Sequence, residues 1–140
     1  EFRNFVGSRE HEILDELKPL PGEHVLRKTT IGAFASTNID SLLRALGCEQ
    51  LYLTGVSTNM CVETTTRMAG NLGFDTYLVP DCCSTSNRIG WDGADYDPEL
   101  VHDMTVANLH GEFCTAITPG DALGLLAADN TQLERVQGNE

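Results

Sequence analysis

Residues 50–73, QLYLTGVSTNMCVETTTRMAGNLG, constrain the fold of this chain more than any other stretch. The β-prone run 51–54 predicts a short buried strand, and the small polar residues 55–59 predict a tight turn. The segment from Cys61 to Gly73 predicts a helix that ends at the glycine. A strand that passes through a turn into a helix therefore places Cys61 at a helix N-terminus.

Cys61 has two possible roles in that position. The unpaired N–H groups and the positive dipole end of a helix favour a negative charge, and so favour the nucleophilic thiolate. The same N–H groups could hold an oxyanion that develops on an attacked carbonyl. The alternative is a buried thiol that packs as a small apolar side chain, as free cysteines often do. The local pattern leaves both roles open.

Two segments together resemble a known family. Residues 55–62, GVSTNMCV, look like the nucleophile motif of the isochorismatase-like cysteine hydrolases, which include nicotinamidases and amidases of N-carbamoyl and ureido compounds. Residues 27–34, RKTTIGAF, are similar to that family's catalytic-lysine segment, and Lys28 lies 33 residues before Cys61. Residues 79–84 resemble the next strand end, and 113–123 the closing strand and last helix. The resemblance covers residues 21 to about 126.

The resemblance implies a role for several residues. Cys61 would attack the carbonyl of a small amide and form a thioester-type intermediate, and Lys28 would lie beside the thiol and favour the thiolate. The backbone N–H groups of Ser57 and Cys61 would form the oxyanion hole. The family usually has a cis peptide bond in this turn, here Val56–Ser57. No cofactor and no metal are expected in this chain.

One part of the family's catalytic machinery has no match. The third catalytic residue of the family is an aspartate at the end of the first strand, well before the lysine segment. Asp15 and Asp40 stand in the wrong context to replace it, and the position of Asp81 is usually structural in the family. We therefore expect the aspartate and the first strands to come from a missing N-terminal segment or a second polypeptide.

The remaining pattern predicts an α/β fold. Further strands are expected at 24–28, 75–80 and 113–118, and helices at 9–17, from Thr37 to Gly47, from Asp97 onward and at 119–128. In the helix after Asp97, the expected apolar face consists of Leu100, Val101, Met104 and Ala107. Strands that alternate with helices predict a parallel sheet, here a three-layer α/β/α domain without its first strands. Residues 1–140 would be the C-terminal two-thirds of one such domain, with a polar tail at 129–140. The long loop 81–98 is a candidate functional loop.

The composition of the chain argues against several classes of binding partner. A net charge of −12 argues against nucleic acid, and no apolar run approaches the roughly 20 residues that a membrane span needs. Five cysteines without a knottin-like pattern fit a reducing, cytoplasmic setting. No Cys/His cluster has zinc-site spacing. A small-molecule amide and an oligomeric partner are the expected interactions, because a sheet without its first strands exposes an edge and apolar helix faces.

Three functions remain possible on this basis. Retention of Lys28 and Cys61 favours a cysteine-dependent hydrolase of small amides. The unmatched aspartate favours a non-catalytic binding or assembly module with the same fold. A thiol redox protein built on Cys82 and Cys83 is the weakest reading, because the pair lacks Cys-x-x-Cys spacing.

Overall fold

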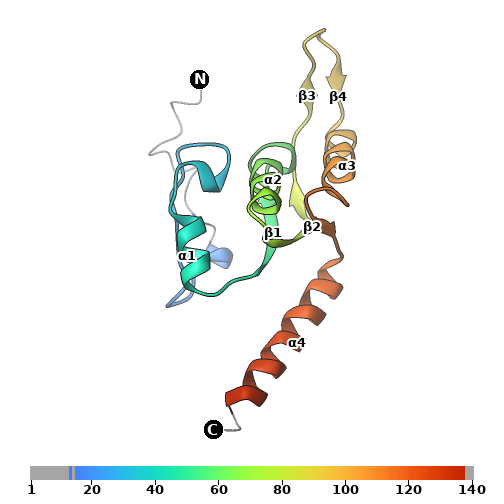
Figure 1. Cartoon of the computed structure of the whole chain (residues 1–140). Helices are drawn as coiled ribbons and strands as arrows, with labels where there is room; N and C mark the ends of the chain where they lie inside the picture. Colours follow the sequence, from blue (N-terminus) through green and yellow to red (C-terminus); the bar gives the residue numbers. More distant parts are fainter. Residues whose placement is uncertain (1–12, 14, 138–140) are drawn as a thin grey trace.

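The computed structural model describes residue 13 and residues 15–137 (Figure 1). The helices and helical turns are η3 (Asp15–Leu17), η4 (Ala33–Ala35), α1 (Ile39–Ala45), η5 (Thr58–Val62), α2 (Glu63–Asn71), α3 (Pro98–Leu109) and α4 (Pro119–Gln137). The strands are β1 (Gln50–Val56), β2 (Asp75–Ser84), β3 (Arg88–Ile89), β4 (Asp95–Tyr96) and β5 (Thr115–Ala116).

The main sheet of the described chain is parallel. Its strand order is β1-β2-β5, and both pairs run in the same direction. Parallel neighbours need a crossover, which η5 and α2 supply between β1 and β2, and α3 supplies before β5. The expected α/β class with a parallel sheet is confirmed.

The core lies where β2 meets the helices. Its buried cluster consists of Val62, Leu78, Leu109 and Cys114. Each belongs to a different segment, respectively η5, β2, α3 and the loop before β5. Burial of this cluster therefore fixes the turn after β1 against the centre of the sheet.

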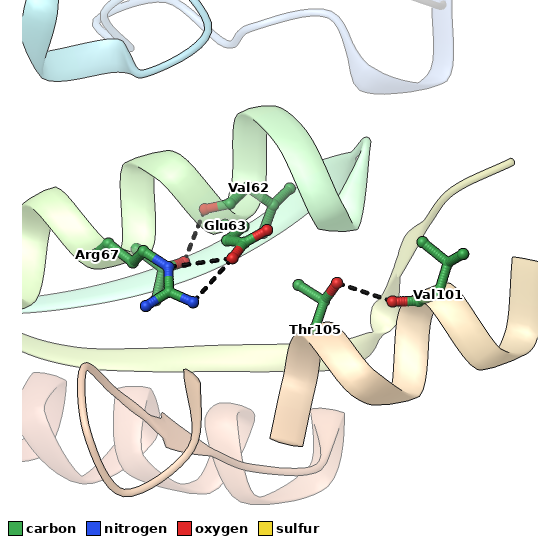
Figure 2. A network of polar contacts seen from close by, with 6 residues as sticks. Val62, Glu63, Arg67, Val101 and Thr105 are labelled. Atoms are coloured by element: carbon green, nitrogen blue, oxygen red, sulfur yellow. Dashed lines mark hydrogen bonds and ion pairs between the residues drawn. The ribbon is translucent and has the colours of Figure 1, made fainter. Parts of the chain in front are cut away.

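Two buried threonines extend this core without leaving a hydroxyl unpaired. Thr66 on α2 donates to the carbonyl of Val62 at 2.8 Å. Thr105 on α3 donates to the carbonyl of Val101 at 2.7 Å, as Figure 2 shows. A buried hydroxyl costs free energy unless it is hydrogen-bonded, and a carbonyl one helical turn back satisfies it. These residues can therefore act as core side chains despite their polarity.

The N-terminal predictions are corrected in part. The expected strand at 24–28 is wrong, because these residues form an exposed irregular segment. A strand needs a hydrogen-bonded neighbour as well as a suitable pattern, and the described sheet consists of β1, β2 and β5. Residues 9–12 and 14 of the expected first helix lie outside the described residues, and 15–17 form a single 3₁₀ turn.

The segment after the predicted strand 75–80 also differs. β2 continues through Pro80 to Ser84, so Asp81 lies within the strand. The expected loop then contains an antiparallel hairpin in which Arg88 pairs with Tyr96. Figure 1 shows this hairpin projecting from the end of the molecule opposite to α4. Trp91 at its tip is fully exposed.

The other helices follow the sequence closely. α1 ends just before Gly47, whose φ of +69° suits a glycine, and Asp97 caps α3 by accepting the N–H of Glu99 at 2.8 Å. The apolar face predicted for α3 is mostly exposed, since Leu100 and Met104 are about half exposed and Ala107 is exposed as well. The residues that α3 buries are Thr105 and Leu109. α4 runs to Gln137, past its expected end at Ala128.

Candidate active site

Cys61 lies in the first turn of the helix that follows β1. The helix begins at Thr58, three residues before the position predicted from the sequence, and its first turn is π-helical. The carbonyl of Ser57 accepts the N–H groups of Met60 at 3.1 Å and Val62 at 3.2 Å. These bonds fix the path of the chain around Cys61, which stays half-buried.

The turn before this helix contains the expected cis peptide bond, Val56–Ser57. Gly55, just before it, has a φ of +125°, a conformation that L side chains rarely adopt. The glycine and the cis bond together turn the chain from β1 into the helix.

Lys28 and Cys61 meet, as the resemblance implied. The Lys28 Nζ lies 3.2 Å from the Cys61 Sγ and donates to the carbonyl of Thr30 at 3.0 Å. A cation in contact with sulfur favours the thiolate form. Thirty-three residues separate this pair in the sequence, so the contact depends on the fold.

Ser36 and Thr65 hold the lysine segment in place. The Ser36 hydroxyl accepts the N–H groups of Thr29 at 2.9 Å and Thr30 at 3.2 Å. The Thr65 hydroxyl on α2 accepts the N–H of Ala33 at 3.2 Å. Thr65 is one helical turn after Cys61, so its place on the same helix face could have been predicted from the sequence.

A cavity of about 230 Å³ opens at the Lys28–Cys61 pair. Its lining residues are Lys28, Leu53, Thr54, Gly55, Val56, Cys61, Val62 and Thr65. Among these described residues there is no carboxylate. The cavity can hold a small molecule beside the Cys61 thiol and the Lys28 ammonium group.

Asp81 faces a different cavity. It lines a space of about 270 Å³ together with Asp121 and Thr118, and none of the residues around Cys61 line that space. The structure therefore does not bring Asp81 together with Cys61 and Lys28. A third cavity, of about 380 Å³, lies between α2, α3 and the hairpin, where Arg88 and Met104 line it.

Two residues, His102 and Thr85, make polar contacts with the Ser57–Asn59 turn that were not predicted from the sequence. Buried Thr58 shares a hydrogen bond of 3.0 Å with the Nδ1 of His102 on α3. Thr85 contacts the turn from the end of β2 through Ser57, at 2.8 Å, and Asn59, at 2.7 Å. Neither His102 nor Thr85 belongs to a sequence pattern, so only the folded arrangement reveals them.

The other cysteines differ from Cys61 in their surroundings. Burial raises the pKa of the Cys114 thiol to about 11, despite an opposing hydrogen bond with the Leu78 backbone. Burial also raises the pKa of Cys83, against a backbone hydrogen bond with Gly55. A raised pKa keeps a thiol protonated at neutral pH, so these two are poor nucleophiles.

The described residues contain neither a cluster of metal ligands nor a membrane-spanning helix. In residues 15–137, together with residue 13, no three His, Cys, Asp or Glu side chains gather in a way that could hold a metal ion. Within that same part of the chain, no helix has the length and apolar character of a membrane span.

Comparison with known proteins decides the family. Residues 2–118 match the model of the isochorismatase domain. The chain belongs to the isochorismatase family. It is 38% identical, over 106 residues, to the uncharacterized isochorismatase family protein YrdC of Bacillus subtilis, covering 76% of this chain and 57% of that protein. It is 32% identical, over 121 residues, to the ureidoacrylate amidohydrolase RutB of Agrobacterium fabrum, covering 86% and 49%.

Solved structures agree with this assignment. A hydrolase of the isochorismatase family from Chromobacterium violaceum superposes with a TM-score of 0.83 at 42% identity, over 88% of this chain and 64% of that one. The chain thus spans about half the length of the curated isochorismatase relatives that it matches.

Proposed function

We propose that the protein is a cysteine-dependent hydrolase of the C–N bond in small amides of the carbamoyl, ureido or nicotinamide type. The observation that carries this proposal is the contact between Lys28 and Cys61 at the mouth of a small cavity. The similarity to RutB, named a ureidoacrylate amidohydrolase, supports an amide as substrate.

The reaction would proceed in two halves. The Cys61 thiolate attacks the carbonyl carbon, and the charge on the carbonyl oxygen is held by the N–H groups of Ser57 and Cys61. The C–N bond then breaks, and the nitrogen leaves as ammonia or an amine after it takes up a proton. Water attacks the resulting thioester, the C–S bond breaks, and the thiolate is restored.

Proton transfer requires an acid–base group, and the described residues that line the cavity include no carboxylate. We assign it to an aspartate from outside residues 1–140, on an N-terminal extension or on a second polypeptide. A positioned acid–base group contributes roughly 10²–10⁴-fold in rate. The 140-residue chain alone should therefore be nearly inactive, and a polypeptide extended at its N-terminus to include the family's aspartate should be active.

The measurement is ammonia release from a panel of carbamoyl, ureido and nicotinamide-type amides. In the extended polypeptide, Cys61→Ala should lower turnover by at least about 10³-fold because it removes the nucleophile. Cys48→Ala, at a half-buried thiol that does not line the cavity, is the matched control and should retain activity. Turnover by Cys61→Ala at the unsubstituted rate would contradict the proposal.

Other outcomes favour other readings. An extended polypeptide that hydrolyses nothing on the panel would favour a non-catalytic binding module. Equal rates for the short and extended forms would refute the role of the external aspartate.

Association with a second chain belongs to the same proposal. Several large apolar side chains are exposed on α3 and the hairpin, among them Leu100, Met104, Ile89 and Trp91. Exposed apolar surface favours assembly, with a second copy or with a chain that supplies the aspartate. Light scattering of the purified 140-residue chain tests this, and a monomer at all concentrations would contradict it.

A further inference from the structure

We propose that Thr85, the residue after β2, is a positioning residue that holds the Ser57–Asn59 turn in the geometry needed for attack on a carbonyl. This inference rests on the proposed function, since it concerns the turn that would carry the oxyanion hole. It adds to that function a residue outside the Lys28 and Cys61 segments.

The hydrogen bonds around Thr85 have a definite direction. The Oδ1 of Asn59 can only accept, so the Thr85 hydroxyl donates its single proton to it, at 2.7 Å. The Thr85 oxygen must then accept at its second contact, which is the Ser57 Oγ at 2.8 Å. The chain of bonds therefore runs from Ser57 through Thr85 to Asn59, and one hydroxyl ties both ends of the turn.

The Ser57 hydroxyl contacts Thr85 in place of the hydrogen bond that a serine at the start of a helix usually makes. Ser57 is the N-cap residue of the helix that carries Cys61, and serine at that position normally accepts an N–H group of the first turn. Here its side chain makes no capping hydrogen bond and is directed to Thr85. The hydroxyl thus holds the residue after the cis peptide bond instead of capping the helix.

The extension of β2 delivers Thr85 to this place. After a shift in register, Gly55 pairs with Cys83 and Val56 pairs with Ser84. Thr85 directly follows the end of β2, and Ser57 directly follows the end of β1, so the two residues lie next to each other. A β2 that ended at Pro80 would leave no pairing partner for the last residues of β1 and would not place Thr85 there.

Thr85 holds the turn whose geometry matters most in the transition state for carbonyl attack. Ser57 would donate its N–H to the oxyanion, and Cys61 follows two residues after Asn59. A misplacement of about 1 Å in a catalytic group can cost on the order of 10²-fold in rate. Removal of the Thr85 hydroxyl should therefore slow carbonyl attack and leave reactions of the same thiol that form no oxyanion unaffected.

The test compares two reactions of Cys61 in the 140-residue chain. With p-nitrophenyl acetate the thiolate attacks the carbonyl, a thioester forms and p-nitrophenolate leaves, so an oxyanion develops. With iodoacetamide the thiolate displaces iodide from carbon, and no oxyanion develops. Mass spectrometry of the Cys61 peptide gives both rates separately from the other thiols.

Thr85→Val should lower the acetylation rate at least about tenfold, with the alkylation rate within about twofold of the original. Thr85→Ser keeps the hydroxyl and should restore acetylation. Thr115→Val, at an exposed threonine on β5, is the matched control and should change neither rate. Ser57→Ala should also slow acetylation, but by no more than Thr85→Val does, because it leaves the Thr85–Asn59 hydrogen bond in place. The double variant should lose no more than Thr85→Val alone, since that substitution already removes the Ser57–Thr85 bond.

Failure of the role of Thr85 and failure of the proposed function would give different results. Unchanged acetylation in Thr85→Val, or an equal fall in both rates, would overturn the role of Thr85 and leave the proposed function standing. If Thr85→Val fails to fold, Ser57→Ala decides in the same way. If the original Cys61 is acetylated no faster than exposed Cys82, the proposed function fails, and the role of Thr85 fails with it.

Discussion

At the residue scale, the central feature is the contact between the Cys61 thiol and the Lys28 ammonium group. Lys28 is exposed, so its charge acts on Cys61 through a largely aqueous medium. Screening by water limits the effect of a charge pair at the surface. The Lys28 charge should therefore increase the reactivity of the Cys61 thiol by a modest factor, and positioning by the fold must supply the rest.

Replacement of the cation measures this factor directly. Lys28→Met should slow the alkylation of Cys61 by iodoacetamide several-fold to about tenfold at neutral pH. Lys18→Met is the control, because exposed Lys18 pairs with Asp15 and has no contact with the cavity. In the unsubstituted protein Cys61 should react faster than Cys82, the most exposed of the other thiols. An unchanged rate in Lys28→Met would show that the lysine does not activate the thiol.

At the scale of elements, the sequence predicted local units well and pairings less well. The strand, turn and helix at 50–73 were predictable, because their signals are local: a β-prone run, a polar turn and a terminal glycine. The strand at 24–28 was not, because pairing decides strands and pattern does not reveal the partner. For the same reason the sequence indicated the Lys28–Cys61 contact only through resemblance to a family.

The extension of β2 past Pro80 has a specific cause. Proline lacks an N–H and is disfavoured within a central strand, so a strand that continues past Pro80 needs an explanation. The pairing with β1 is irregular at this point: Leu53 pairs with Leu78, and Gly55 pairs with Cys83. Pro80 falls in the unpaired interval, so its missing N–H breaks no ladder bond. The irregularity is not visible in the sequence, and Thr85 could not have been predicted for that reason.

At Gly70, packing between elements reverses the usual preference of a helix for alanine over glycine. Alanine is about 1 kcal/mol better than glycine in a helix interior. A Cβ at Gly70 on α2 would lie 2.5 Å from the carbonyl oxygen of Phe113, which is backbone and cannot turn aside. Overpacking of this kind costs typically 1–3 kcal/mol.

Gly70→Ala should therefore lower the free energy of unfolding, by up to about 2 kcal/mol, since the overpacking outweighs the gain in helix propensity. Gly124→Ala in α4 is the matched control, because a Cβ there meets nothing within 4 Å. That substitution should stabilise the protein by up to about 1 kcal/mol. Urea denaturation of the three proteins measures both values, and a Gly70→Ala variant as stable as the original would refute the predicted clash.

At the scale of the whole molecule, a small core carries the stability. Cys114 belongs to the buried cluster with Leu78 and Leu109, and it is only 8% exposed. A core of this size makes one buried ionisable group significant, because small domains are only marginally stable. The stability of the chain should therefore depend on alkaline pH through Cys114.

The sign of this dependence follows from the raised pKa. Burial raises the pKa of Cys114 from 9.0 to about 11, so above pH 9 the unfolded chain loses the thiol proton while the folded chain keeps it. Stabilisation is thus complete below pH 9 and is lost as the pH rises toward 11, by about 2 kcal/mol at pH 10.5. Urea denaturation under reducing conditions at pH 8 and pH 10.5 measures the loss.

Cys114→Ala should be less stable at both pH values but should lose about 2 kcal/mol less between them, since it has no thiol to ionise there. The raised pKa of Cys83 affects both proteins equally and cancels in this difference. Equal losses in the two proteins would mean that the Cys114 thiol ionises as readily in the folded chain as in the unfolded one.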